Sequence, residues 1–333
     1  MGSGENLGKT GLVFDEIFLR HRTTPGHPEC PERLLAIRDS LRAAGIWDKL
    51  ELIPVRPAER ELVELVHESP YIDRVAALAA KGGGYLDSPD TPISADSFHV
   101  ALCAVGGLIE AAERILAGSI DNAFAAVRPP GHHALPDHAM GFCLFNNVAI
   151  VARYLQRQHG LERILIVDWD VHHGNGTQAI FYDDPNVLYF SIHQYPFYPG
   201  TGSRQERGWG DGLGFTINAP VPAGTDEQTW LSAFREHLLP VLEHFPPDFV
   251  LISAGFDAHE LDLLGRLGVT TEGYAEATRI VKEIADRFAG GRLLSALEGG
   301  YHLGALGASV AAHVAVLLNA PTAVREQGKE GSE

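Results

Sequence analysis

Acidic residues and histidines stand at short, regular spacing in this 333-residue chain. Asp168, Asp170 and His172 occupy alternate positions, and an extended backbone directs such residues to the same side. With Asp257 arriving from another segment, Asp170 and His172 supply three metal ligands and leave a position for water, as catalytic sites do. Zn²⁺ is the first candidate, although one imidazole and two carboxylates also suit Fe²⁺ or Co²⁺.

The adjacent pair His132 and His133 are candidates for moving protons, because a metal-activated water loses one and a departing group gains one. A catalytic imidazole needs a partner that sets its tautomer and basicity, and Asp168 and Asn175 have no metal role. Since one partner is charged and the other neutral, they separate the two imidazole pKa values. Tyr301 follows two glycines, so its phenol can approach the metal and donate to an oxyanion.

Each of these groups follows a short apolar run that predicts a β-strand. The runs begin at residues 11, 123, 163, 187, 215, 248 and 293, and helical patterns cover residues 31–45, 96–118, 226–245 and 271–290. This alternation predicts an α/β fold with a mostly parallel sheet sandwiched between helices. Ligands bind at the C-terminal strand ends of such sheets. We therefore expect the loops after the runs at 123, 163, 187, 248 and 293 to converge.

The domain organisation is predicted to be simple, because the chain shows no internal repeat and no long linker. We expect one catalytic domain over residues 11–320, with flexible ends at 1–10 and 321–333. A helical cap is the alternative for the strand-poor first hundred residues. Two helix starts are also predicted: Ser69 as an N-cap before Pro70, and Thr225 with Gln228 as a capping box.

Composition excludes several kinds of partner. The net charge of −17 disfavours direct binding to nucleic acid or anionic membranes and favours cationic substrates such as amines or Lys-rich tails. No signal peptide or bilayer-length apolar run is present, which predicts a cytoplasmic protein without a membrane partner; an oligomer is possible. Cys30, Cys103 and Cys143 are odd in number and far apart, so no disulfide is expected.

Other readings of individual motifs are weaker. The glycine-rich segment at Gly174 fits neither common phosphate-binding pattern, and the chain lacks the G-x-S-x-G elbow of serine hydrolases. Asp257 alone could be a helix N-cap, but it stands at a strand end. Histidines without reactive neighbours are expected at the surface or as hydrogen-bonded core residues; these are His67, His159 and His244.

The segments RPPGHHA, GFCLFNN, VDWDVHHGNGTQ, SIHQYPFYPGTG, SAGFDAH and LEGGYH resemble, in order, the signature blocks of the histone deacetylase family, which has the arginase/deacetylase fold. HPECPERL is similar as well. The resemblance runs from about Gly11 to the helix after Tyr301. Asn175, where class I members carry Asp, and the HPExPER block resemble the class II and bacterial deacetylase-like branch.

The resemblance implies roles for the residues that match the family's blocks. Zn²⁺ would bind Asp170, His172 and Asp257. His133 would be the general base and His132, paired with Asp168, its electrostatic or acid partner, while Tyr301 would stabilise the oxyanion. A structural K⁺ is implied on Asp168, Ser191 and the carbonyls of Asp170, His172 and Ile192, and a second monovalent site around Phe181, Val187 and Phe215.

The resemblance also implies a narrow channel for an acyl-lysine stem. Gly141, Phe142 and Tyr198 match its lining, and Asp90 corresponds to the rim carboxylate that holds the substrate backbone. Tyr198 stands where Phe is common. Leu264 stands where polyamine-specific members carry an acidic gatekeeper, which argues against a dedicated polyamine enzyme, although Glu260 and Asp262 are acidic groups nearby.

Together these patterns predict a zinc-dependent amide hydrolase that removes acetyl or other acyl groups from lysine side chains or small amines. An acetylpolyamine amidohydrolase is the alternative within the same chemistry. A ureohydrolase is disfavoured because Gly174, rather than an acidic residue, follows the second histidine pair. From another class, a catalytically inert module that binds acyl-lysine would keep the same groove.

Overall fold

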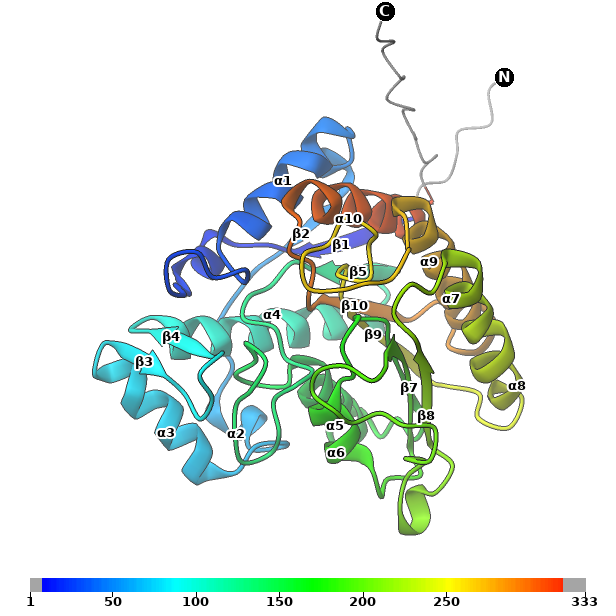
Figure 1. Ribbon diagram of the computed structural model, residues 1–333, viewed down its shortest axis with the longest axis horizontal. Coiled ribbons are helices and arrows are strands. Elements are labelled where there is room, and N and C mark those ends of the chain that lie inside the picture. The colour runs from blue at the N-terminus through cyan, green and yellow to red at the C-terminus, as the bar shows by residue number, and fades with distance from the viewer. Residues whose placement is uncertain (1–7, 320–333) are drawn as a thin grey trace, which may run out of the picture.

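A single sheet of eight strands lies at the centre of the protein (Figure 1). The computed structural model describes residues 8–319, so most of the predicted flexible ends lie outside the described residues. The sheet order is β2-β1-β5-β10-β9-β6-β7-β8, and all neighbouring strands are parallel. The strands are β1 Thr10–Val13, β2 Glu51–Ile53, β5 Asn122–Ala125, β6 Ile164–Asp168, β7 Val187–Gln194, β8 Thr216–Val221, β9 Phe249–Ala254 and β10 Leu293–Leu297.

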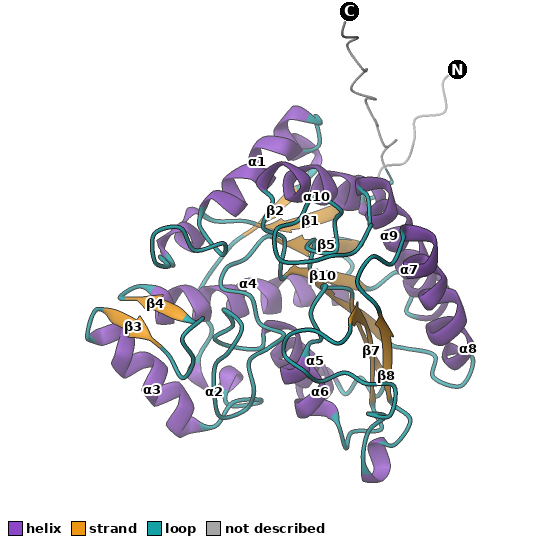
Figure 2. Cartoon of the chain, in the orientation of Figure 1, coloured by secondary structure: helices purple, strands orange, loops and turns teal. Residues whose placement is uncertain are grey.

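The central strands are buried over their whole length, because helices cover both faces of the sheet. Helices α1, α9 and α10 pack together on one side, and α4 packs with α5 on the other, giving three layers (Figure 2). The α-helices are α1 Glu32–Ala43, α2 Arg60–Val63, α3 Ser69–Ala80, α4 Ser97–Leu116, α5 Asn147–His159, α6 Asn175–Phe181, α7 Glu227–Ala233, α8 Leu239–Leu242, α9 Thr271–Phe288 and α10 Leu303–Leu317. A π-helical turn, Phe234–Leu238, joins α7 to α8, and short 3₁₀ turns lie at Glu16–Arg20, Trp47–Lys49 and Gly210–Gly212.

The alternative of a separate helical cap at the N-terminus is wrong. The first hundred residues contribute β1 and β2 to the main sheet and a small antiparallel pair, β3 Gly83–Tyr85 with β4 Pro92–Ser94. Strand β2 has no apolar run because it lies at the sheet edge, where Glu51 and Leu52 are exposed. β1 begins at Thr10, one residue before the predicted start of the domain.

Both predicted helix caps are displaced by one residue. Glu68, rather than Ser69, is the N-cap of α3, which places Ser69 and Pro70 in its first turn. Asp226, rather than Thr225, caps α7 by accepting from the backbone N–H of Thr229. The hydroxyl of Thr225 instead donates to the carbonyl of Pro222 in the preceding turn, at 2.7 Å.

Two further observations concern hydrophobic helices and cysteines. No helix within residues 8–319 is long and apolar enough to span a bilayer. The thiols of Cys30, Cys103 and Cys143 are free.

His67 is a buried, hydrogen-bonded core residue, as predicted for a histidine without reactive neighbours. Its Nδ1 lies 2.9 Å from the carbonyl of Leu135, and the backbone N–H of Asn146 donates to its Nε2 at 2.9 Å. The ring thus joins the loop before α5 to Asn146, which caps that helix. Burial lowers the pKa of His67 to about 4.

This lowered pKa predicts a pH-dependent loss of stability. Below pH 6.5 the unfolded chain protonates His67 while the folded chain does not, so the free energy of unfolding falls as pH drops from 6.5 toward 4. Between pH 7.5 and 5 we expect His67 to contribute a loss of about 2 kcal/mol. His67→Gln keeps a donor and an acceptor but cannot titrate. Urea unfolding at both pH values should show a smaller loss in this variant, and an equal loss would contradict the assignment.

Candidate active site

The loops that carry the reactive residues meet because their strands are neighbours. The five strands that precede these loops lie side by side in the order β5, β10, β9, β6, β7. Since all are parallel, their C-terminal ends share one edge of the sheet. This arrangement brings together side chains separated by more than 100 residues of sequence.

Asp170, His172 and Asp257 form a buried group whose potential ligand atoms all lie within 4.8 Å of one another. The Nδ1 atom of His172 lies 3.1 Å from Asp170 Oδ1 and 3.3 Å from Asp257 Oδ2. Asp170 and His172 follow β6, and Asp257 follows the adjacent strand β9. The N-cap alternative for Asp257 is wrong, because its Oδ1 accepts from the backbone N–H of Val171, at 2.9 Å, in the neighbouring loop.

This group fits a divalent cation. Asp257 Oδ2 is buried and makes no hydrogen bond within the described residues, although His172 Nδ1 lies 3.3 Å away. Burial and the charge of Asp170 raise the pKa of Asp257 to about 7. A bound cation would offset the unfavourable free energy of ionising this buried carboxyl. Gly299 allows the close approach: a Cβ there would lie 2.1 Å from Asp257 Oδ2 and 2.6 Å from Asp170 Oδ2.

The two histidines after β5 have different partners. His132 Nδ1 lies 3.0 Å from Asp168 Oδ2, whereas His133 Nδ1 lies 2.8 Å from Asn175 Oδ1. Burial lowers the pKa of His133 well below its usual range, and the neighbouring His132 and His172 add to this effect. Burial also opposes charge on His132, but Asp168, Asp170 and Glu298 outweigh it and raise that pKa. The two partners thus separate the pKa values of the histidines, and that of His133 is the lower.

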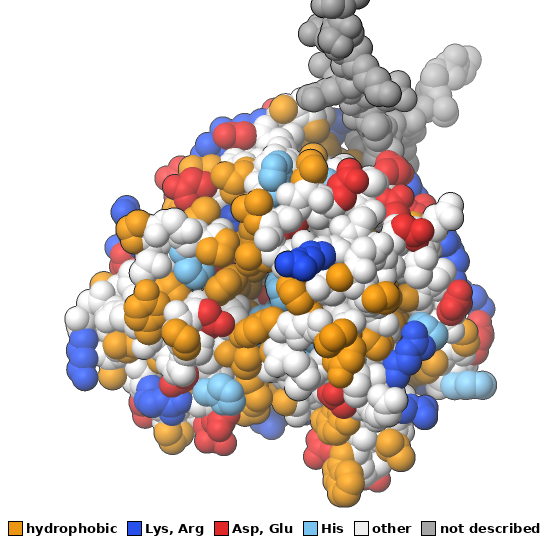
Figure 3. All heavy atoms as spheres, viewed as in Figure 1, with side chains coloured by type: hydrophobic (Ala, Val, Ile, Leu, Met, Phe, Trp, Pro, Cys, Tyr) orange, Lys and Arg blue, Asp and Glu red, His pale blue; other side chains and the backbone are white. Residues whose placement is uncertain are grey.

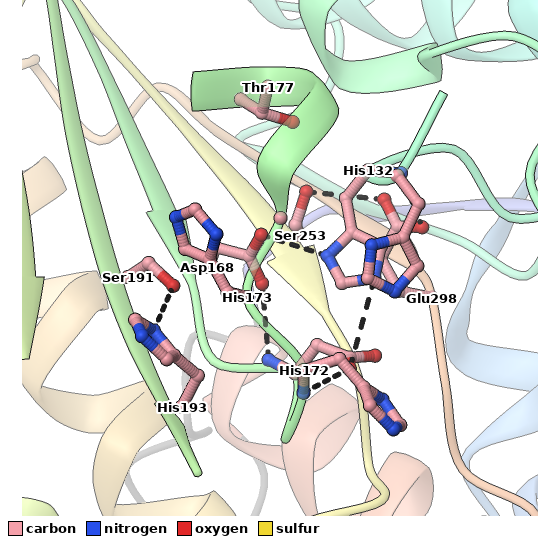
Figure 4. Close-up of polar contacts among 12 residues, drawn as sticks. His132, Asp168, His172, His173, Thr177, Ser191, His193, Ser253 and Glu298 are labelled. Carbon is pink, nitrogen blue, oxygen red and sulfur yellow. Dashed lines mark hydrogen bonds and ion pairs between the residues drawn. The ribbon is translucent and has the colours of Figure 1, made fainter. Parts of the chain in front are cut away.

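Glu298 is a buried residue of this site that sequence reasoning did not assign. Its Oε2 accepts from the backbone N–H groups of Gly131, at 2.7 Å, and His132, at 3.1 Å. Ser253 donates to its Oε1 (Figure 4). The carboxylate thereby holds the loop that carries both histidines. In the sequence, its position directly before the two glycines of the LEGGYH block could have indicated that it belongs to the site.

Tyr301 lines the same cavity as His133. Burial and the charge of Asp257 raise the pKa of its phenol well above the usual range, so the hydroxyl keeps its proton. The guanidinium of Arg33 sits over the ring at 5.1 Å and also donates to the carbonyl oxygens of Glu298 and Gly300. Arg33 belongs to the HPECPERL block, whose contact with the site was not predicted.

A cavity of about 210 Å³ opens onto this group. Asp90, His133, Gly141, Phe142, His172, Phe197, Tyr198, Leu264 and Tyr301 line it. Hydrophobic side chains gather near the middle of the face shown in Figure 3. All five residues predicted to contact substrate are thus in one place, and Phe197, which stacks on His172 at 5.3 Å, was missed.

The loop at Gly141 is closely fitted to the histidine pair. Gly141 has φ +57°, and a Cβ there would lie 2.3 Å from the His133 ring. Phe142 also has a positive φ, 70°, which is uncommon for a bulky residue and marks local strain. Its ring lies edge-on to Tyr301, with the ring centroids 5.8 Å apart.

Tyr198 stands where phenylalanine is common in the family that the sequence resembles, and its additional hydroxyl makes a hydrogen bond. It donates to Asp90 Oδ2 at 3.1 Å, while Thr91 and the backbone N–H of Gly141 donate to Asp90 Oδ1. The hydrogen bond therefore joins two walls of the cavity. It also fixes the direction of the one acidic side chain among the described residues that line this cavity.

The residues implied for potassium lie on β6, β7 and adjoining segments. Asp168 and Ser191 are paired in register on β6 and β7, which places them side by side, and Asp168 stands two residues before Asp170 in the chain. Ile192 is buried on β7, while Phe181 ends α6 and Val187 begins β7. The carbonyl of Phe215 already accepts from the N–H of Tyr189, at 2.9 Å.

Comparison with known proteins agrees with this geometry. A model of the histone deacetylase domain matches residues 27–317. A protein of Archaeoglobus fulgidus named "Probable deacetylase" is 45% identical over 88% of this chain and 81% of its own length. The human polyamine deacetylase HDAC10 is 40% identical over 94% of this chain, which spans 48% of that protein. The crystal structure of the HDA15 HD domain matches with a TM-score of 0.89 and 41% identity, covering 94% of this chain and 89% of the other.

The chain belongs to the histone deacetylase family, and its fold is that of the family: one α/β domain with an eight-stranded parallel sheet between helices. Its buried Asp-His-Asp group is consistent with the divalent metal site of a deacetylase or amidohydrolase.

Proposed function

We propose that this protein is a zinc-dependent deacylase that hydrolyses the side-chain amide of acyl-lysine in polypeptides. The observation that carries the proposal is that His133, His172 and Tyr301 line one cavity, which brings together a candidate metal ligand, a neutral base and a phenol donor. Water adds across the amide C–N bond, so the products are a carboxylic acid and a free amine.

The residues have complementary roles in this reaction. A bound Zn²⁺ on Asp170, His172 and Asp257 would polarise the amide carbonyl and acidify water. Neutral His133 accepts the proton of the attacking water, and the resulting imidazolium protonates the leaving amine. His132, held by Asp168, supplies positive charge next to the developing oxyanion, and Tyr301 donates a hydrogen bond to that oxygen. We also propose the K⁺ site at Asp168 and Ser191, with the carbonyls of Asp170, His172 and Ile192, as a structural support of this arrangement.

The cavity favours an acyl-lysine over an acylated polyamine. A polyamine carries a second ammonium, and burying a charge without a partner is costly. Leu264 is apolar, Glu260 is exposed, and Asp262 accepts from backbone N–H groups of Tyr301 and Leu264. Asp90 is the remaining carboxylate, and it already accepts from Tyr198.

Substrate comparison tests this proposal. We expect kcat/KM of the zinc-loaded protein to be at least about tenfold higher for an acetyl-lysine peptide than for N-acetylputrescine, equivalent to about 1.4 kcal/mol. A preference for acetylputrescine would support the polyamine alternative, which the 40% identity to the human polyamine deacetylase also motivates. Stoichiometric metal without hydrolysis of any acyl-amine would support the inert binding module.

The Tyr198–Asp90 hydrogen bond gives a second prediction. Tyr198→Phe removes the donor to Asp90 Oδ2, so the carboxylate that would hold the peptide backbone keeps donors only at its Oδ1 and is held less firmly. We expect KM for an acetyl-lysine peptide to rise about fivefold, corresponding to roughly 1 kcal/mol, with kcat changed less than about twofold. Tyr85→Phe, at a tyrosine that is 59% exposed, is the matched control. Unchanged KM in Tyr198→Phe would show that the hydroxyl has no part in binding.

A further inference from the structure

Asp262 joins two segments of the site through one carboxylate. Its Oδ2 accepts from the backbone N–H groups of Tyr301, at 2.7 Å, and His302, at 3.1 Å. Its Oδ1 accepts from the backbone N–H of Leu264, at 2.9 Å. The loop that carries Leu264, on the cavity wall, is thus tied to the segment that carries Tyr301.

Tyr301 needs such an anchor because its backbone follows two glycines. Gly300 has φ +117°, a conformation that few other residues adopt, and glycine leaves the chain many alternatives. Packing against Phe142 and Arg33 restrains the ring, but neither contact holds the Tyr301 N–H. Two adjacent N–H groups bound to one oxygen fix the backbone from which the phenol projects.

The simpler explanation is that Asp262 caps helix α10. That helix already has a cap, because the side chain of His302 accepts from the backbone N–H of Ala305 at 3.1 Å. Asp262 instead binds Tyr301 and His302, which precede the first helical residue, Leu303. These hydrogen bonds therefore hold the segment that carries Tyr301 rather than the first turn of α10.

We propose that Asp262 is a positioning residue that fixes Tyr301 for hydrogen bonding to the oxyanion and links it to the Leu264 wall. The proposal rests on the deacylase function above. It assigns Asp262 a role other than acidic recognition of the substrate, because its oxygens face backbone N–H groups and it does not line the cavity.

A double-mutant cycle tests this role. Misplacing a catalytic group by about 1 Å can cost on the order of 100-fold, so we expect Asp262→Ala to lower kcat about 10- to 100-fold on an acetyl-lysine peptide. Glu260→Ala removes the same charge from an exposed position of the same loop and should change kcat less than about twofold. In a Tyr301→Phe background, Asp262→Ala should lower kcat further by less than about twofold, because the hydroxyl that it positions is gone.

The possible outcomes distinguish a wrong role for Asp262 from a wrong assignment of the deacylase function. If Asp262→Ala lowers kcat equally with and without the Tyr301 hydroxyl, Asp262 is a general structural residue and the inference is wrong. If Asp262→Ala matches Glu260→Ala while the wild type is active, the inference also fails and the deacylase function stands. A wild-type protein that hydrolyses no acyl-amine overturns both.

A second variant, Asp262→Asn, keeps the proposal testable if Asp262→Ala does not fold. Asp262→Asn retains one oxygen that can accept from Tyr301 and His302 and loses the acceptor for Leu264. We expect its kcat to lie between those of the wild type and Asp262→Ala, with the same non-additivity toward Tyr301→Phe. Metal content and the thermal midpoint, measured on each variant, establish that the proteins compared are folded and loaded.

Discussion

The Asp257→Asn variant is expected to lose its bound metal and at least about 1000-fold in kcat/KM, because several kcal/mol of transition-state stabilisation depend on the ion. Asparagine has nearly the same shape and its carbonyl can still accept from Val171 N–H, the partner of Asp257 Oδ1. The amide NH₂ then takes the place of Oδ2, the buried oxygen without a hydrogen bond. A positively polarised group there repels a cation.

Metal analysis and activity are measured on the same samples. Glu260→Gln is the control, since it removes one negative charge from an exposed side chain of the same loop. We expect that control to bind one metal per chain and to turn over like the wild type. Full metal content in Asp257→Asn would show that the metal site is wrongly assigned.

Tyr301→Phe is expected to lower kcat about 100- to 1000-fold with little change in KM, because the hydroxyl bonds only to the charge that develops in the transition state. The raised pKa of Tyr301 keeps that donor protonated throughout the neutral range. Phenylalanine keeps the ring beneath Arg33 and beside Phe142, so the cavity should keep its shape.

Steady-state kinetics on an acetyl-lysine peptide check this expectation. Metal content of the variant should equal that of the wild type, because no metal ligand is altered. Undiminished turnover would remove Tyr301 from the mechanism. A rise in KM with unchanged kcat would make it a substrate-binding residue instead.

The central strands could be predicted because each is buried on both faces and therefore appears as a continuous apolar run. The same logic fails for β2 and for the β3–β4 pair. These strands have three residues each, too few to show a burial pattern, and β2 and β3 also carry exposed or glycine positions such as Leu52 and Gly84. Their place in the fold depends on neighbouring strands rather than on their own burial pattern.

The site could be predicted as far as its reactive side chains, because each follows a strand whose end had to lie at the same sheet edge. The residues that hold these side chains in place could not be predicted. Glu298 binds the His132 N–H across 166 positions of sequence, Asp262 binds the Tyr301 N–H across 39, and Arg33 binds the Glu298 carbonyl across 265. A backbone N–H or carbonyl exists at every residue, so nothing local indicates which one a distant side chain will bind.

The most direct test of the account is to follow acetate and free amine released from an acetyl-lysine peptide by one protein sample carried through three states. The zinc-loaded protein should release the two products in equal amounts. Removal of zinc by a chelator should abolish the release, and one equivalent of zinc per chain should restore it. Product release that continues after the chelator has removed all metal would contradict a metal-dependent deacylase built on Asp170, His172 and Asp257.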